Sequence, residues 1–226
     1  MNMSKIQSID PFIKKTKLCD FFSHISRIVA FDSDKHSQIT NYFKQYFDKL
    51  PTENIIFYEK GISLNAQEFV MNCFNMTTIH FNIEKVMTRI SNNEIPYSLI
   101  NVKDNISNIV YSYESSMPQS FDKDTIVCVP FPLCDYSGLA SGKYIVIEGN
   151  KRMSYFVNNK HNLNFDIMCI NALYTDIRCF TDLYSHFVFL YVSCMFYCNE
   201  IPLDAIEEVV NISIENLDIL NHMQLA

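Results

Sequence analysis

The segment Glu148-Gly149-Asn150-Lys151-Arg152 concentrates residue types that bind phosphate. It follows a β-branched run at 144–147 and precedes a helix-like stretch at 151–157. A glycine between a strand and a helix allows a turn that aims backbone N–H groups at an anion. Arg152 adds a guanidinium that can hold phosphate through two parallel hydrogen bonds, and Lys151 adds a second positive charge. The segment therefore predicts a phosphate site formed by Gly149, Asn150, Lys151 and Arg152.

A structural interpretation of the same residues stays open. Arg152 lies four residues after Glu148. An arginine and a carboxylate at this spacing can form an ion pair that ties down the turn without binding any ligand. The two interpretations predict different results for Arg152→Ala: loss of nucleotide binding with the fold largely intact, or loss of stability in a protein that has no nucleotide affinity to lose.

The elements that must position this turn form a strand-rich stretch in the middle of the chain. Apolar or β-branched strands are predicted at 79–81, 125–131, 144–147 and 167–172. A connection with two glycines, at 134–143, joins the second and third of these. We therefore expect an α+β fold in which a small mixed sheet carries the turn and amphipathic helices on both sides of it in the chain cover the sheet.

The stretch GKYIVIEGNKRMSYF (142–156) resembles the second signature box of the ParB/sulfiredoxin superfamily, in which a hairpin strand ends in Gly-x-x-Arg. Gly149 and Arg152 match the two defining positions. The flanking strands match in order, so the resemblance covers about residues 78–173. It implies a ParB/sulfiredoxin-like core and a turn that binds the phosphates of a nucleotide such as ATP, ADP or CTP, with Mg²⁺ as a possible accompanying ion.

Departures from the family narrow the expected chemistry. Asn150 stands where sulfiredoxins carry their cysteine nucleophile, which argues against sulfiredoxin chemistry. Glu148 matches the acidic residue of the free-serine kinases, and its expected role is catalytic, as a general base or Mg²⁺ ligand. Glu94 and Glu114 are candidates for the second acid. Whether the protein is an enzyme stays open: a phosphotransferase or nucleotide hydrolase is one expectation, and a non-catalytic nucleotide-sensing or protein-interaction module is the alternative. A nuclease-like or DNA-associated regulator comes third.

Composition and charge exclude several other classes. The 226 residues are 48% hydrophobic and 19% charged, which excludes a disordered linker protein. Eighteen basic residues against 25 acidic ones give a net charge of −7, so binding to nucleic acid by bulk charge is not expected. Residues 161–226 hold one basic residue, Arg178, against nine acidic residues. This acidic third is predicted to be solvated surface or, alternatively, the contact site of a basic protein partner.

The sequence predicts a cytoplasmic protein without a membrane span. No secretory signal follows the N-terminal lysines, and the most apolar run, 187–198, is twelve residues long where a bilayer needs about 20. The eight cysteines are therefore expected to be reduced and mostly buried. Neither the cysteines nor the six scattered histidines have the spacing of a metal site, so no bound metal is predicted from them.

Three regions are expected along the chain. They are a helical N-terminal extension (1–76), a ParB/sulfiredoxin-like domain (77–175) and a helical C-terminal segment packed on it (176–226). Apolar residues at helical spacing predict the following helices besides that after the turn: 19–30, 34–50, 63–73, 82–90, 184–198, 203–210 and 215–222.

Overall fold

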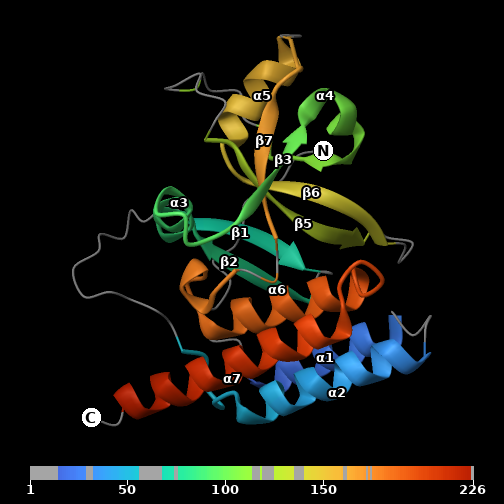
Figure 1. The fold of residues 1–226 in the computed structure, drawn as a ribbon, viewed down its shortest axis with the longest axis vertical. Helices are drawn as coiled ribbons and strands as arrows, with labels where there is room; N and C mark the ends of the chain where they lie inside the picture. Colours follow the sequence, from blue (N-terminus) through green and yellow to red (C-terminus); the bar gives the residue numbers. More distant parts are fainter. Residues whose placement is uncertain are drawn as a thin grey trace.

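A computed structural model of the chain describes residues 15–28, 33–55, 68–73, 76–113, 118, 125–134, 140–159, 162–171, 173 and 175–224. These residues form a five-stranded sheet, a two-stranded sheet and helices that pack around both (Figure 1). The predicted α+β class is confirmed. The polar segment 115–124, whose Ser, Pro, Asp and Gln content predicts a loop, lies almost wholly outside the described residues.

The five-stranded sheet is mixed and has the order β3-β7-β5-β6-β4. Its members are β3 (Tyr97–Asn101), β4 (Ile109–Val110), β5 (Val127–Cys134), β6 (Ala140–Glu148) and β7 (Asp166–Ile170). β5 and β6 form the predicted antiparallel hairpin, and their pairing continues to Cys134 and Ala140, into the segment expected to be a connection. β3 is antiparallel to β7, whereas the pairs β4–β6 and β5–β7 are parallel.

The smaller sheet corrects two sequence predictions. The strand expected at 79–81 is part of β2 (Thr77–Asn82), but β2 pairs with β1 (Glu68–Cys73) in a sheet of its own. β1 occupies the second half of a segment predicted to be helical, and the first half lies outside the described residues. The extended form prevails because Phe69 pairs in register with Phe81, whose ring packs on Phe189, 5.2 Å between centroids.

Four helices form a layer beneath the two sheets in Figure 1. They are α1 (Lys15–Ile28), α2 (Ser33–Lys49), α6 (Leu183–Phe196) and α7 (Leu203–Gln224). α6 is buried all round except at its last residue, and it links this layer to the sheets. The helices predicted at 203–210 and 215–222 are one continuous helix, α7, since no proline or glycine interrupts the chain between them.

The five-stranded sheet is covered on both faces. One face joins α1, α2, α6 and α7 in a single apolar core, which also includes the short helix α3 (Ile83–Ser91). The other face forms a second, smaller core with α4 (Val102–Asn105) and α5 (Asn150–Asn158), which lie above the sheet in Figure 1. Among the described helices, none has the length and apolar character needed to cross a bilayer.

Candidate functional site

The turn predicted from the sequence has the expected strand–glycine–helix form. β6 ends at Glu148, and Gly149 adopts a left-handed conformation, φ +86°, directly before α5. A Cβ atom on Gly149 would lie 2.9 Å from Cγ1 and 3.2 Å from Cα of Ile126. Both the positive φ and this close approach require glycine. The glycine is thus explained by backbone conformation and packing, before any ligand is considered.

The Arg152 side chain faces the protein. Its Nη2 atom lies 2.9 Å from Glu148 Oε1 and donates to the Thr125 carbonyl oxygen at 3.2 Å, while Nη1 donates to the Thr125 hydroxyl. The side chain is only 12% exposed. Arg152 therefore ties the end of β6 to Thr125, two residues before β5, which is the structural interpretation that the sequence left open.

The two residues between Gly149 and Arg152 differ in exposure. The Asn150 side chain donates to the Val146 carbonyl oxygen at 3.0 Å and accepts from the Ser112 backbone N–H at 2.8 Å. Lys151 is exposed. The four residues predicted for the phosphate site and the predicted catalytic Glu148 thus lie in one turn, as their adjacency in the sequence requires. The side chains of Glu148, Asn150 and Arg152 nevertheless bond to the protein itself, and the first turn of α5 offers mainly Lys151 to solvent.

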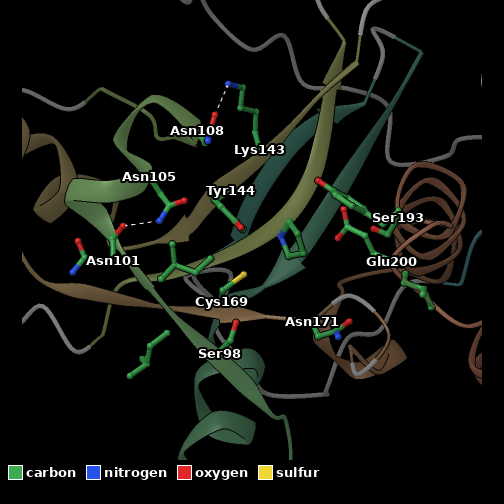
Figure 2. Close-up of a pocket in the computed structure, with 15 residues that line it drawn as sticks. Ser98, Asn101, Asn105, Asn108, Lys143, Tyr144, Cys169, Asn171, Ser193 and Glu200 are labelled. Carbon is green, nitrogen blue, oxygen red and sulfur yellow. Dashed lines mark hydrogen bonds between the residues drawn. The ribbon is translucent and has the colours of Figure 1, made fainter.

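A groove of about 730 Å³ lies elsewhere on the molecule, between the five-stranded sheet and the C-terminal end of α6 (Figure 2). Its walls come from β3, α4, β5, β6, β7 and the segment 193–201, with the 3₁₀-helix η1 (Ile106–Asn108) at one end. We call it the sheet–helix groove. It is lined by Ser98, Leu99, Ile100, Asn101, Asn105, Asn108, Pro130, Lys143, Tyr144, Cys169, Asn171, Ser193, Tyr197, Glu200 and Ile201.

The groove is lined by one basic residue, Lys143, and one acidic residue, Glu200. The Lys143 ammonium donates to the Ser107 carbonyl oxygen at 3.1 Å and to the Asn108 side chain at 3.2 Å (Figure 2). Glu200 is exposed. Burial, with the nearby Glu200 carboxylate, raises the pKa of Tyr197 to about 12, and burial also raises the pKa of Tyr144. Both tyrosines are neutral hydrogen-bond donors at physiological pH.

A buried hydroxyl in this lining lacks a partner. Ser193 lies in α6, is fully buried and lines the groove. Its Oγ atom forms no hydrogen bond within the described part of the chain. A buried polar atom without a partner costs roughly 1–3 kcal/mol, so such an atom calls for a specific explanation.

Little in the amino-acid sequence indicates this groove. Three of its four asparagines, Asn101, Asn105 and Asn108, fall within eight residues, the fourth, Asn171, lies far along the chain, and no motif links them. The one usable signal is Ser193, a polar residue within the most apolar run of the chain. The apolar run itself predicts only a buried segment, and the structure shows the buried helix α6 there.

Comparisons with known proteins give no assignment for either region. No family model matches the sequence, and no curated protein or solved structure is significantly similar to it. Within the described ranges, no three His, Cys, Asp or Glu side chains come together in a group suited to a metal ion.

Proposed function

We propose that this protein is a non-catalytic nucleotide-binding protein whose ligand occupies the sheet–helix groove. The observation that carries the proposal is the fully buried Ser193 hydroxyl, which lines the groove and has no partner among the described residues. A ligand group that bonds to this hydroxyl would remove the cost of leaving it unsatisfied. A volume of about 730 Å³ lies within the range of small-molecule sites, roughly 300–1,000 Å³.

The lining suits the three parts of a nucleotide. Asparagine amides present donor and acceptor side by side, as the edge of a nucleobase requires, and aromatic faces such as those of Tyr144 and Tyr197 stack on bases. A carboxylate such as Glu200 accepts hydrogen bonds from ribose hydroxyls. Lys143 supplies the positive charge for a phosphate.

The contacts of the turn support binding without catalysis. The Glu148 carboxylate is held by Arg152 at 2.9 Å, and a carboxylate engaged in an ion pair is a poor general base. Of the two candidates for a second acid, Glu94 lies 3.3 Å from Arg89, and Glu114 lies outside the described residues. A phosphotransferase or hydrolase therefore has less support than a nucleotide-sensing protein.

Two lysine variants decide which region binds phosphate. Calorimetric titration of the wild type with ATP, ADP, CTP and GTP, with and without Mg²⁺, gives the reference affinities, and adenosine and cytidine serve as ligands without phosphate. We expect Lys143→Gln, in the groove, to weaken triphosphate binding about tenfold and to leave nucleoside binding unchanged. Lys151→Gln, at the turn, is the matched control and should bind like the wild type.

The opposite result for the two lysine variants would assign the phosphate site to the turn instead of the groove. Loss of triphosphate binding in Lys151→Gln alone would place the phosphates at the start of α5, as the sequence analysis expected. A wild type that binds none of the six compounds at millimolar concentration would end the nucleotide proposal. Release of phosphate from labelled ATP or CTP above the rate without protein would contradict the non-catalytic part.

A specific feature of α7 favours a second candidate function, the binding of a basic protein partner. Glu208, Ile212, Glu215 and Ile219 are exposed and recur at helical spacing, so they form one solvent-facing stripe. Ile212 is 48% exposed and Ile219 is 57% exposed. Alternating carboxylates and isoleucines would fit a basic amphipathic helix.

This second candidate is tested with a fluorescently labelled helical peptide whose one face alternates lysine and leucine residues from turn to turn. Fluorescence anisotropy should show binding to the wild type that weakens at high salt and is lost in Glu208→Lys/Glu215→Lys. Equal binding to wild type and variant would contradict it.

A further inference from the structure

Two cysteines face each other across neighbouring strands under the sheet–helix groove. Cys128 in β5 and Cys169 in β7 are partners in the parallel register of these strands. Both belong to the smaller core, on the face of the sheet that α5 covers. Adjacent strands lie about 4.8 Å apart, and a disulfide accepts Cα–Cα separations of roughly 4.4–6.8 Å. The register therefore holds the two thiols at a separation that a disulfide can span.

The two thiols already interact, and they do so unequally. Cys128 donates a hydrogen bond to Cys169, which raises the pKa of Cys128 together with burial. The same bond lowers the pKa of Cys169, and a hydrogen bond from Ser98 adds to this effect. The thiolate, the reactive form of a cysteine, is therefore favoured at Cys169.

The residues of the pair also differ in access. Cys169 lines the groove, whereas Cys128 does not and is fully buried (Figure 2). A small reagent that enters the groove therefore reaches Cys169 first, with Cys128 beside it on the neighbouring strand.

We propose that Cys128 and Cys169 form a redox-active dithiol that a hydroperoxide oxidises through the groove. The Cys169 thiolate attacks one peroxide oxygen, the O–O bond breaks, and hydroxide leaves as Cys169 becomes a sulfenic acid. The Cys128 sulfur then attacks the Cys169 sulfur, the S–O bond breaks, and water leaves as the disulfide forms. In sum, two thiols are oxidised to one disulfide, and hydrogen peroxide is reduced to two molecules of water.

Another cysteine pair of the chain provides an internal comparison. Cys194 lies in the last turn of α6, Cys198 lies two residues beyond the end of this helix, and both are buried. Burial raises the pKa of Cys194, and the Cys198 sulfur lies 3.3 Å from His36 Nε2. Neither of these cysteines lines the groove. Oxidation is therefore expected to select the Cys128–Cys169 pair.

The test is to treat the full-length protein with hydrogen peroxide, to block the remaining thiols with N-ethylmaleimide and to identify cross-linked peptides by mass spectrometry. Trypsin releases Cys169 within 161–178 and Cys128 within 124–143, a peptide that also holds Cys134. Fragmentation of this linked pair shows whether Cys128 or Cys134 carries the bond. We expect a Cys128–Cys169 disulfide that dithiothreitol removes.

Variants separate the formation of the Cys169 sulfenic acid from the formation of the disulfide. Cys128→Ser should block the disulfide and leave a sulfenic acid on Cys169, which dimedone traps, while Cys169→Ser should give neither product. Cys134→Ser should cross-link like the wild type. A wild type in which exposed Cys19 is modified but the Cys128–Cys169 bond does not form would overturn the proposal. This wild-type result does not depend on the folding of any variant or on the ligand of the groove.

Discussion

The turn at the end of β6 and the sheet–helix groove use their polar groups in opposite ways. At the turn, Arg152, Glu148 and Asn150 all bond to neighbouring parts of the protein, and the arginine is 12% exposed. In the groove, Ser193 is fully buried and has no partner within the described residues. The turn has the residues of a binding motif, but their side chains form hydrogen bonds within the protein. The groove has no sequence motif, but its Ser193 hydroxyl could form a hydrogen bond with a ligand.

This difference shows why residue type alone misleads. A guanidinium binds phosphate and carboxylate with the same geometry, so an arginine near a glycine turn fits either partner. The partner is decided by what lies within reach, and Glu148 and Thr125 lie within reach of Arg152. Substitutions at the two regions should therefore separate folding effects from binding effects.

The largest expected effect is that of Gly149→Val on stability. Valine cannot relax at φ +86°, and its Cβ would press against the Ile126 backbone. We expect a loss of about 4 kcal/mol in the free energy of unfolding, measured by urea denaturation. A variant as stable as the wild type would show that the turn has room to move, and it would weaken the contrast between the turn and the groove.

Arg152→Ala should cause the second-largest loss of stability. The change removes the ion pair between Arg152 and the Glu148 carboxylate and the hydrogen bonds that Arg152 donates to Thr125. We expect a loss of about 2–3 kcal/mol in the free energy of unfolding, with nucleotide affinity retained in the fraction that stays folded. A variant of wild-type stability that has lost nucleotide binding would restore the phosphate interpretation of the turn.

Ser193→Ala should show the reverse behaviour. Removing a buried hydroxyl that has no partner changes stability by less than about 1 kcal/mol, and the change can be favourable. The same substitution should weaken nucleotide binding, because the ligand loses a buried hydrogen bond. Thermal melts in parallel with calorimetric titration give both readouts. A marked loss of stability without a ligand present would mean that the hydroxyl is satisfied within the protein.

Lys151→Gln should have the smallest effect on stability. The side chain is exposed, and exposed substitutions usually change the free energy of unfolding by less than about 0.5 kcal/mol. Urea denaturation should therefore give the wild-type midpoint. A larger loss would assign Lys151 a structural role like that of Arg152.

Much of the fold was predictable wherever the signal was local. The strand, turn and helix around Gly149 and the helices α1, α2 and α6 lie close to their predicted positions, because hydrophobic spacing and glycine placement act over a few residues. The wrong predictions concern which strands pair with each other. β1 was predicted as a helix, and β2 was assigned to the wrong sheet, since both depend on partners and on packing against α6.

The sequence by itself determined the α+β class, the helical flanks and the form of the turn, including the need for glycine at position 149. These features follow from backbone conformation and from local patterns of apolar residues. Only the tertiary structure decided that Arg152 faces Glu148 and Thr125, that Ser193 lines a groove without a partner, and that Cys169 lies beside Cys128. The physical reason is distance: each of these outcomes depends on which groups the folded chain brings within a few ångströms, and strand pairing between segments far apart in the chain decides that.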